Sequence, residues 1–379
     1  MGKKKAKEES DGAEIIAGIG ADDIEESIIK EYGNILLSGN SIKDARQIVI
    51  PVSPAINIGI GGGVPEGTWF VLTGKPKVGK TTTALHFAVK AQQLKYANPK
   101  LCPEGRRVYY LNVEGRIKER DLEGFPGLDM SRFKMIQSEP GNILNAEKYL
   151  SIAEKLITSV PGCVVIIDSY SALCTEAEMV GSMSDQQRAD GAKLLAKFCR
   201  KMANIVPVNR CIVVGITHIM SDPSGMSKGD REKSGNAVAF QADIKIWGKW
   251  GEEWKLGEKQ IGQKAHWDVK FSAIGPPGAK VISLLRYGIG VDEESELAQI
   301  MIDMGFAQAS GAWYGLIYLV DAEAEEFKEL KPKEKTKAIY DASKKCQGLE
   351  GIRRFLIDNP DERKKIESQI YDMMGIKQC

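Results

Sequence analysis

Continuous apolar runs and helically spaced apolar residues alternate along most of the chain. Each run is short enough for a buried strand, and the runs are Gln47–Val52, Trp69–Leu72, Val108–Val113, Cys163–Asp168 and Cys211–Thr217. Segments with apolar residues at helical spacing lie between them, at 84–91, 143–158 and 188–206. This alternation is typical of parallel strands that helices cover on both faces. The pattern therefore predicts an α/β core with a mostly parallel central sheet.

The second half of the chain changes character twice. Alternating apolar and polar residues predict an antiparallel extension of the sheet, with strands at Asp243–Trp250, His266–Phe271 and Lys280–Arg286. Tryptophans at 247, 250, 254 and 267 favour packing of a sheet face, with a base-stacking platform as the alternative. From about Val291 the pattern predicts a small C-terminal domain of short helices, at Glu294–Met304, 322–330, 335–346, 350–357 and 360–374.

The N-terminal 45 residues cannot form a core of their own. Residues 1–20 are basic, then polar and glycine-rich, and we expect them to be disordered. Isoleucine spacing from Asp22 to Tyr32 predicts a short helix, and the apolar run Ile35–Leu37 precedes the turn residues Ser38–Asn40. This small helix and strand must pack on the following domain or on a neighbouring subunit.

Composition narrows the class of protein. The 379 residues are 43% hydrophobic and 27% charged, which is typical of a globular protein. The net charge is +1, so the protein as a whole is not basic, and nucleic acid would have to bind to local basic patches. There is no 18-residue apolar stretch and no signal-peptide pattern, so we expect no membrane contact and a cytoplasmic location. The seven cysteines are scattered, which predicts reduced thiols and no zinc site.

The strand at Trp69–Leu72 leads into a loop, Gly74–Thr81, with the spacing G-x-x-x-x-G-K-T, and then into a helical segment. This order predicts a P-loop, in which backbone N–H groups and a helix N-terminus bind phosphate. Lys80 would reach the terminal phosphates of ATP, and the Thr81 hydroxyl would hold Mg²⁺. The predicted ATP-binding residues are Gly74, Lys75, Pro76, Lys77, Val78, Gly79, Lys80, Thr81 and Thr82. The alternative is a glycine-rich turn before an ordinary helix.

Other motifs have both a functional and a structural interpretation. Asp168 ends an apolar run, which beside a P-loop favours a metal-binding Walker B carboxylate over a turn or helix cap. The glycine run Ile58–Pro65 lacks a following Lys-Thr, so a tight connection is favoured over a second phosphate loop. Basic clusters in the C-terminal domain suggest weak nucleic-acid contact or a solvated face, and they are Lys344-Lys345, Arg353-Arg354 and Arg363-Lys364-Lys365.

These features occur together with two polar loops, at about 175–187 and 219–236. The set resembles the RecA recombinase family, and its bacteriophage UvsX branch in particular, over roughly residues 30–375. The similar segments, in family order, are Ile50–Gly67, Ser171–Gly181, Gly235–Ala237, Gly311–Tyr314 and Phe355–Pro360.

The resemblance implies a RecA-like P-loop ATPase core at 46–290, with a small N-terminal helix/strand polymerisation segment at 21–45 and a small α(+β) C-terminal domain at 291–379. It implies a DNA-dependent ATPase that uses ATP and Mg²⁺, forms a homo-oligomeric helical filament on single-stranded DNA, and pairs that strand with homologous double-stranded DNA. Single-strand-binding and mediator proteins would assist in a phage-infected bacterial cell. The alternatives are a hexameric helicase or another P-loop ATPase on the same core, and a recombination mediator that binds ATP without turnover.

The resemblance also assigns site residues. Glu114 would be the general base, although by spacing alone it could start a surface turn, and His218 would sense the γ-phosphate rather than be an ordinary buried histidine. Lys270 would reach the ATP of the neighbouring subunit, whereas the second lysine position is Ser272. The region at Arg120–Leu122 offers no aromatic residue to stack on adenine. The DNA-binding residues would be Met179, Val180, Arg188, Lys228, Arg231, Lys233, Gly235 and Asn236.

A last resemblance concerns assembly. Gly33–Ser38 is similar to the short strand that adds to the sheet edge of the next subunit in this family. Pairing of the strand within its own subunit is the alternative.

Overall fold

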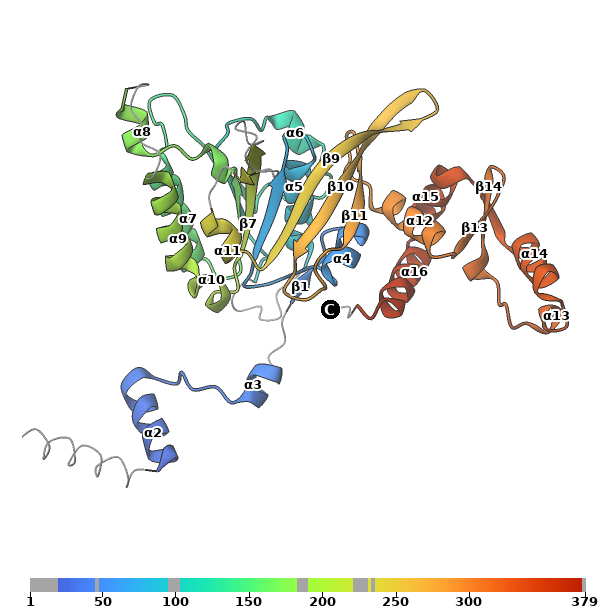
Figure 1. The fold of residues 1–379 in the computed structure, drawn as a ribbon, viewed down its shortest axis with the longest axis horizontal. Coiled ribbons are helices and arrows are strands. Elements are labelled where there is room, and N and C mark those ends of the chain that lie inside the picture. Colours follow the sequence, from blue (N-terminus) through green and yellow to red (C-terminus); the bar gives the residue numbers. More distant parts are fainter. Residues whose placement is uncertain are drawn as a thin grey trace, which may run out of the picture. The chain divides into compact units, whose positions relative to one another are not determined.

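A central sheet organises the larger of two compact units, residues 48–379 (Figure 1). The computed structural model describes residues 20–44, 48–94, 103–182, 190–220, 231–232 and 236–376. Within these residues ten strands form the sheet, in the order β12-β11-β10-β9-β3-β7-β6-β4-β5, with β8 paired to β7. The pairs from β5 to β9 are parallel, whereas the pairs from β9 to β12 are antiparallel. This confirms the predicted α/β fold with a mostly parallel sheet.

The expectation is wrong for Gln47–Val52, where only Val49–Ile50 form a strand, outside this sheet, and for Asp243–Trp250, which pairs parallel with the strand before the P-loop. Of the parallel strands described, four come from the other apolar runs, one from Asp243–Trp250, and one, β5, is an addition. Their bounds are β3 (Trp69–Gly74), β4 (Val108–Asn112), β5 (Phe133–Ile136), β6 (Val164–Asp168), β7 (Ile212–Met220) and β9 (Ile244–Leu256). The remaining strands of the sheet are β8 (Arg231–Glu232), β10 (Lys259–Phe271), β11 (Lys280–Arg286) and β12 (Gly290–Val291). A separate pair, β1 (Val49–Ile50) and β2 (Val64–Pro65), is antiparallel. Edge strand β5 has one fully buried side chain, Phe133, so its apolar pattern was too weak to detect.

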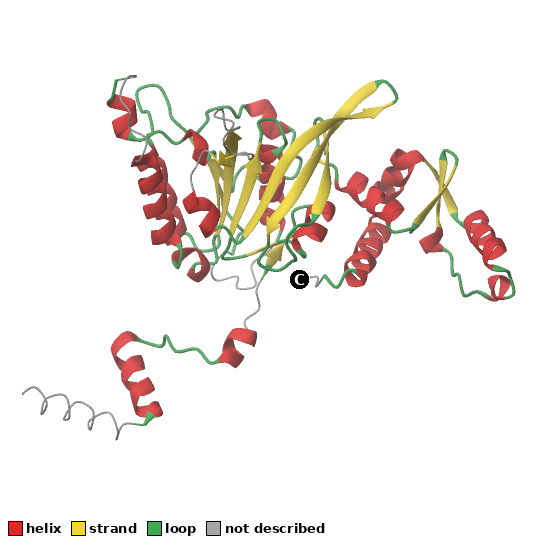
Figure 2. Ribbon diagram, in the orientation of Figure 1, coloured by secondary structure: helices red, strands yellow, loops and turns green. Residues whose placement is uncertain are grey.

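Helices cover both faces of the sheet (Figure 2). One face packs on α4 (Pro54–Ile60) and α5 (Lys80–Gln93), and the other on α7 (Ala146–Ser159), α9 (Asp190–Met202) and α10 (Ile205–Val208). Shorter helical segments are α6 (Glu119–Glu123), η1 (Tyr170–Ala172), α8 (Glu176–Val180) and α11 (Asn236–Gln241).

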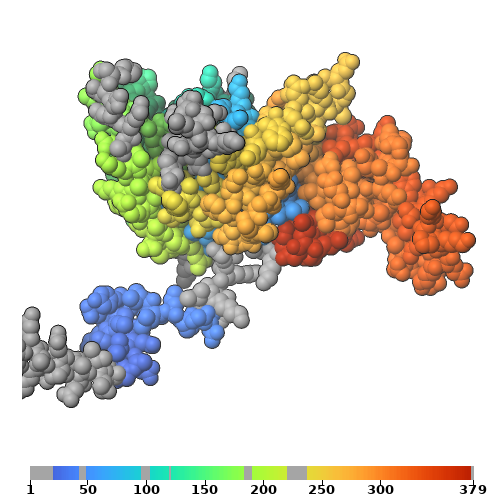
Figure 3. Space-filling model, viewed as in Figure 1, coloured from blue at the N-terminus to red at the C-terminus, as the bar shows by residue number. Residues whose placement is uncertain are grey.

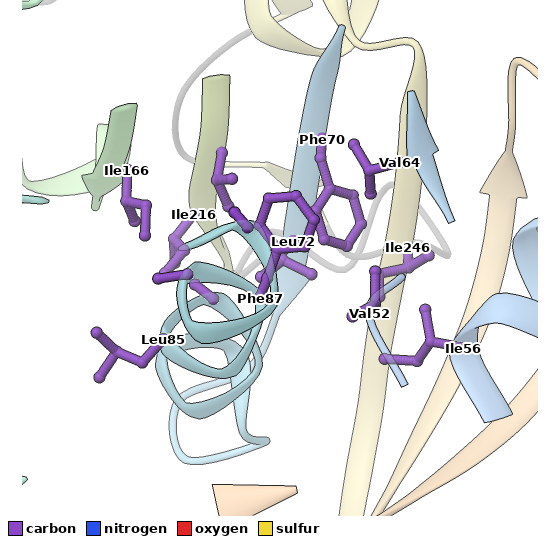
Figure 4. Packing of buried hydrophobic residues seen from close by; sticks show 14 of the residues in the cluster. Val52, Ile56, Val64, Phe70, Leu72, Leu85, Phe87, Ile166, Ile216 and Ile246 are labelled. Carbon is purple, nitrogen blue, oxygen red and sulfur yellow. The ribbon is translucent and has the colours of Figure 1, made fainter. Parts of the chain in front are cut away.

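Strand β3 shows how the two faces divide the core. Phe70 and Leu72 point to one cluster, and Trp69 and Val71 point to the other, as the two-residue period of a strand requires. Phe70 meets Phe87 of α5 edge-on at 5.9 Å between ring centroids (Figure 4). Truncation of such a buried aromatic to alanine costs about 3–5 kcal/mol. This packing fixes the P-loop helix against its strand.

Helix α4 corrects the expectation of a tight connection at Ile58–Pro65, because Ile58–Ile60 complete a helix. Ser53 caps it by accepting a hydrogen bond from the Ile56 N–H, and Gly61 ends it in the left-handed region at φ 91°. The helix has only seven residues, too few for its apolar spacing to stand out.

Strands β9 and β10 are longer than predicted and extend past their neighbours as a hairpin, which projects from the surface in Figure 3. Beyond Trp250 most side chains of β9 are exposed and Trp254 is the buried exception, so the alternation of apolar and polar residues that marks a strand is weak there. Trp254 and Trp267 are buried, which agrees with sheet packing. Trp250 departs from that expectation because it is 55% exposed and stacks on His266 at 4.5 Å.

The region predicted as a small α(+β) C-terminal domain contains a three-stranded sheet, whose strands the sequence pattern did not locate. Its strands are β13 (Ala307–Ser310), β14 (Trp313–Leu316) and β15 (Lys344–Gln347). Its helical elements are α12 (Glu293–Asp303), η2 (Ile317–Leu319), α13 (Glu325–Lys328), α14 (Pro332–Ala342), α15 (Gly348–Asp358) and α16 (Pro360–Met373). The helix predicted at 335–346 therefore extends too far, because α14 ends at Ala342 and Lys344–Gln347 pair with β14.

The other compact unit spans residues 1–47, of which 20–44 are described. It contains the expected helix, α2 (Ala21–Tyr32), and an unexpected one, α3 (Gly39–Asp44), where a turn was predicted. Residues 33–38 form no strand here, and Ile35, Leu36 and Leu37 are exposed. The predicted disordered tail lies outside the described residues except for Gly20. Among the described helices, none has the length and apolar character needed to cross a membrane.

Candidate nucleotide site

The P-loop connects β3 to α5 at the carboxyl end of the parallel strands. Gly79 has φ 98°, and a Cβ atom there would lie 2.3 Å from Leu285 Cδ1. Gly74 has a similar constraint, because a Cβ would lie 2.5 Å from the carbonyl oxygen of Gly248. Both glycines of the motif are thus required by the fold, and they let the loop pass close to β9 and β11 while α5 begins at Lys80.

Lys80 is buried at the bottom of the loop. Its Nζ donates hydrogen bonds to the carbonyl oxygens of Gly74 at 3.0 Å and Lys75 at 2.8 Å. Burial lowers the pKa of the Lys80 ammonium to about 8. The nearby carboxylates of Asp168 and Glu114 oppose that shift. A phosphate in the loop would do the same and would favour the charged ammonium.

Asp168 and Thr81 meet where β6 ends beside the start of α5. The Thr81 hydroxyl donates a hydrogen bond to Asp168 Oδ2 at 2.7 Å. The Tyr110 hydroxyl donates to the same oxygen at 2.5 Å. Burial raises the pKa of the Asp168 carboxyl above its ordinary value.

Glu114 follows β4 and is held by two side chains from neighbouring strand ends. Its Oε1 accepts hydrogen bonds from Ser169 Oγ at 2.7 Å and from His218 Nε2 at 2.6 Å. Arg116 lies 3.2 Å from Oε2. The hydrogen bond from His218 is the main reason that the pKa of Glu114 falls to about 2, so this carboxylate is ionised at neutral pH.

His218 links this carboxylate to the segments that carry the predicted DNA-binding loops. Its backbone N–H donates to Ser171 Oγ at 2.8 Å, in η1 just before the first loop. Its strand, β7, continues to Met220, which pairs with Arg231 of β8. His218 therefore contacts Glu114 and Ser171, and it lies on the strand that leads into the second predicted loop.

These groups line one cavity of about 560 Å³. Predicted residues on its wall are Pro76, Lys77, Gly79, Lys80, Thr81, Thr82, Glu114, Asp168 and His218. Gly74 and Lys75 supply the carbonyls that hold Lys80, and Val78 is buried beneath the loop. The lining also includes Phe125, Leu285, Arg286 and Tyr287. A cavity with a P-loop, a lysine and carboxylates at one end and aromatic rings on its wall suits a nucleoside triphosphate.

The oxygen donors fit Mg²⁺. Within the described part of the chain, no group of His, Cys, Asp and Glu forms a metal cluster of its own. Mg²⁺ does not need one, because it binds through one or two protein oxygens together with phosphate oxygens and water. Thr81 and Asp168 are the residues that would hold it.

Lys270 lies apart from this cavity. The residue lies on β10, where its Nζ is 3.6 Å from Asp268 Oδ2 and 5.2 Å from the centroid of the Trp247 ring on β9. The lysine does not line the cavity of its own chain. Its predicted contact with a neighbouring subunit stays a prediction.

Half of the predicted DNA-binding residues fall on described positions. Met179 and Val180 end α8 and are 44% and 82% exposed. Arg231 lies in β8, and Asn236 is the first residue of α11. Arg188, Lys228, Lys233 and Gly235 lie outside the described residues.

Several site residues were missed by sequence reasoning. Ser169 follows Asp168 directly, so its place beside that carboxylate could have been inferred. Tyr110 sits inside an apolar strand, where nothing in the sequence separates a core ring from a hydrogen-bond donor. Phe125 and Tyr287 are the aromatic rings of the nucleotide cavity, although no adenine-stacking residue was found near 120–122.

Comparisons with known proteins agree with this geometry. A family model for the RecA N-terminal domain matches residues 21–292. The chain is similar to Protein RecA of Geobacter sulfurreducens, with 28% identity over 327 residues that cover 86% of this chain and 85% of the relative. It is 26% identical to Protein RecA of Streptomyces rimosus over 347 residues, covering 91% of this chain and 81% of the relative. Protein RecA of Nocardioides is also 26% identical, over 355 residues that cover 92% and 90%. Since the family model spans well over half of its length, the chain belongs to the RecA family.

Proposed function

We propose that this protein is a DNA-dependent ATPase and recombinase. It forms filaments on single-stranded DNA and catalyses homologous pairing and strand exchange. Membership of the RecA family supports this function, and so does the complete set of nucleotide-handling groups around one cavity. The observation that carries the proposal is the position of His218 between Glu114 and the roots of both predicted DNA-binding loops.

In this proposal the P-loop N–H groups and Lys80 hold the ATP phosphates. Mg²⁺, held by Thr81 and Asp168, supplies charge neutralisation at the phosphates. Glu114 accepts the proton of the attacking water as general base. Ser169 and His218 fix the Glu114 carboxylate before nucleotide arrives.

His218 serves as the γ-phosphate sensor. A carboxylate with a pKa of about 2 is a weak base, and the His218 hydrogen bond is the largest cause of that low pKa. A γ-phosphate oxygen would compete for His218 Nε2, which would release Glu114 and raise its basicity. Because β7 continues toward the second loop, the same exchange would reorganise the loop with nucleotide state.

DNA binding falls to the two loops. Met179 and Val180 expose apolar side chains, which suits contact with bases. Arg188, Lys228, Arg231 and Lys233 would contact phosphates. Gly235 and Asn236 would supply further donors.

Assembly uses the N-terminal segment and Lys270. Ile35, Leu36 and Leu37 are exposed and unpaired among the described residues, which is a liability unless a partner strand covers them. Strand addition to a second copy is head to tail and propagates into an open helix. Lys270 would then reach the ATP of the neighbouring copy.

Electron microscopy of the full chain with single-stranded DNA and a non-hydrolysable ATP analogue tests the function. Long filaments, together with DNA-stimulated phosphate release and strand exchange, are expected. Closed rings would indicate the helicase instead. ATP binding without any turnover would indicate a mediator.

We further propose that the chain lies in the phage UvsX branch and acts in the cytoplasm of an infected bacterial cell, with single-strand-binding and mediator proteins as partners. His218 supports this, because the phage branch resembles this sequence in having His at the sensor position, where bacterial members have Gln. His218→Gln tests the point. We expect this variant to lose DNA-stimulated hydrolysis if the site is adapted to histidine.

A further inference from the structure

Tyr110 places a phenol inside an otherwise apolar cluster. The side chain is fully buried on β4, and its ring lies 6.1 Å from that of Phe133, centroid to centroid. A phenylalanine would fill this space without burying a hydroxyl. The hydroxyl must therefore be satisfied by a specific partner, and that partner is Asp168.

The Asp168 carboxylate uses one oxygen for two protein donors. Oδ2 accepts from Tyr110 at 2.5 Å and from Thr81 at 2.7 Å. Among the described residues, the other oxygen, Oδ1, has no protein hydrogen-bond donor. Two donors on one oxygen fix the rotation of the carboxylate and leave Oδ1 available to a ligand.

The hydrogen bond to Asp168 also orients the Thr81 hydroxyl. Its hydroxyl proton points to Asp168, so the oxygen lone pairs remain free to bind a cation. Without Tyr110, Thr81 alone would hold the carboxylate, and a single hydrogen bond allows the carboxylate to rotate.

We infer that Tyr110 is a positioning residue of the metal–nucleotide site, whose hydroxyl holds Asp168 against Thr81 in the orientation that receives a divalent cation bound to a nucleoside triphosphate. The inference rests on the proposed function, because it assumes that Mg²⁺–ATP is the ligand. Removal of a side chain that hydrogen-bonds to a metal ligand commonly lowers metal affinity by about 10- to 100-fold.

Tyr110→Phe in the full chain tests the inference, with Tyr109→Phe as matched control. Tyr109 is the preceding residue of β4 and packs on the opposite face of the sheet. Binding of a fluorescent, non-hydrolysable ATP analogue is measured in EDTA and again in saturating Mg²⁺. The ratio of the two dissociation constants reports how far Mg²⁺ tightens nucleotide binding, without any turnover.

For Tyr110→Phe we expect this ratio to fall by about 10-fold or more, with metal-free affinity unchanged, whereas Tyr109→Phe retains the wild-type ratio. In an Asp168→Asn background, Tyr110→Phe should have no further effect, because the hydroxyl acts through the carboxylate. A ratio within about twofold of wild type for Tyr110→Phe overturns the inference. A variant unfolded at the assay temperature also overturns it, since the hydroxyl would then serve the core. If the wild-type protein binds the ATP analogue with the same affinity in EDTA and in Mg²⁺, the proposed function is contradicted instead.

Discussion

Replacement of Glu114 by glutamine separates its chemistry from its structural contacts. The amide oxygen can still accept the hydrogen bonds from Ser169 and His218, so the loop and cavity should keep their shape. What disappears is the negative charge and the ability to accept a proton. We expect ATP and DNA binding to persist while hydrolysis falls by roughly 10²–10⁴. That loss corresponds to about 3–5 kcal/mol of activation free energy.

The charge also predicts a pH dependence of stability. The pKa of Glu114 is lowered from 4.5 to about 2 in the folded protein, so the unfolded chain takes up the proton first as pH falls. The stabilisation from this carboxylate is complete above pH 4.5 and is lost as the pH falls through about 2. Glu114→Gln should therefore melt below wild type at pH 7, and the difference should shrink in acid.

Three measurements test these expectations for Glu114→Gln. They are phosphate release in the presence of single-stranded DNA, nucleotide titration, and melting curves at several pH values. Glu139→Gln is the matched control, because Glu139 is an exposed glutamate that follows the neighbouring strand β5 and does not line the cavity. A normal rate for Glu114→Gln would show that another group takes the proton. Loss of nucleotide binding would show that Glu114 holds ATP rather than activates water.

Three further changes address binding, DNA contact and assembly. Lys80→Ala should abolish productive ATP binding in a nucleotide titration, because no other side chain in the loop supplies a buried cation to the phosphates, and unchanged affinity would refute this role. Neutralising Lys228, Arg231 and Lys233 together should weaken single-strand binding uniformly across sequences and flatten its salt dependence, whereas an unchanged slope would place the DNA elsewhere. Leu36→Asp should give a folded monomer without filaments or DNA-stimulated hydrolysis, as checked by light scattering and a thermal melt. A collapsed melt would favour pairing of that strand within its own subunit.

The core could be predicted from sequence because its signals are local. The P-loop carries its chemistry within eight residues, and each buried parallel strand is a continuous apolar run. The pairing of Tyr110 with Asp168 was not predictable, since it depends on the register between β4 and β6, and the two residues are 58 positions apart in the sequence. The strands of the C-terminal domain were missed because each has four residues and half-exposed side chains, so no apolar alternation marks them.

The C-terminal arginines show how structure changes the interpretation of a charge cluster. Arg353 lies 2.8 Å from the buried Asp292, and Arg363 lies 2.6 Å from Glu293. Glu293 also contacts His86 at 2.8 Å and Lys90 at 2.6 Å, both on the helix that begins at the P-loop.

Arg363 is thus committed to a carboxylate that also contacts helix α5, and Arg353 to one that also binds Arg286 of strand β11. Breaking such a buried pair is costly, because it leaves an uncompensated charge, so phosphate groups of DNA cannot recruit either arginine without disrupting these ion pairs. Arg354, which is 74% exposed, keeps a charge that faces solvent. Lys344, Lys364 and Lys365 are exposed as well, so the solvent-facing cations of these clusters are Arg354 and three lysines. Any salt dependence of single-strand binding that remains after the cations of the two loops are neutralised should therefore come from these four side chains.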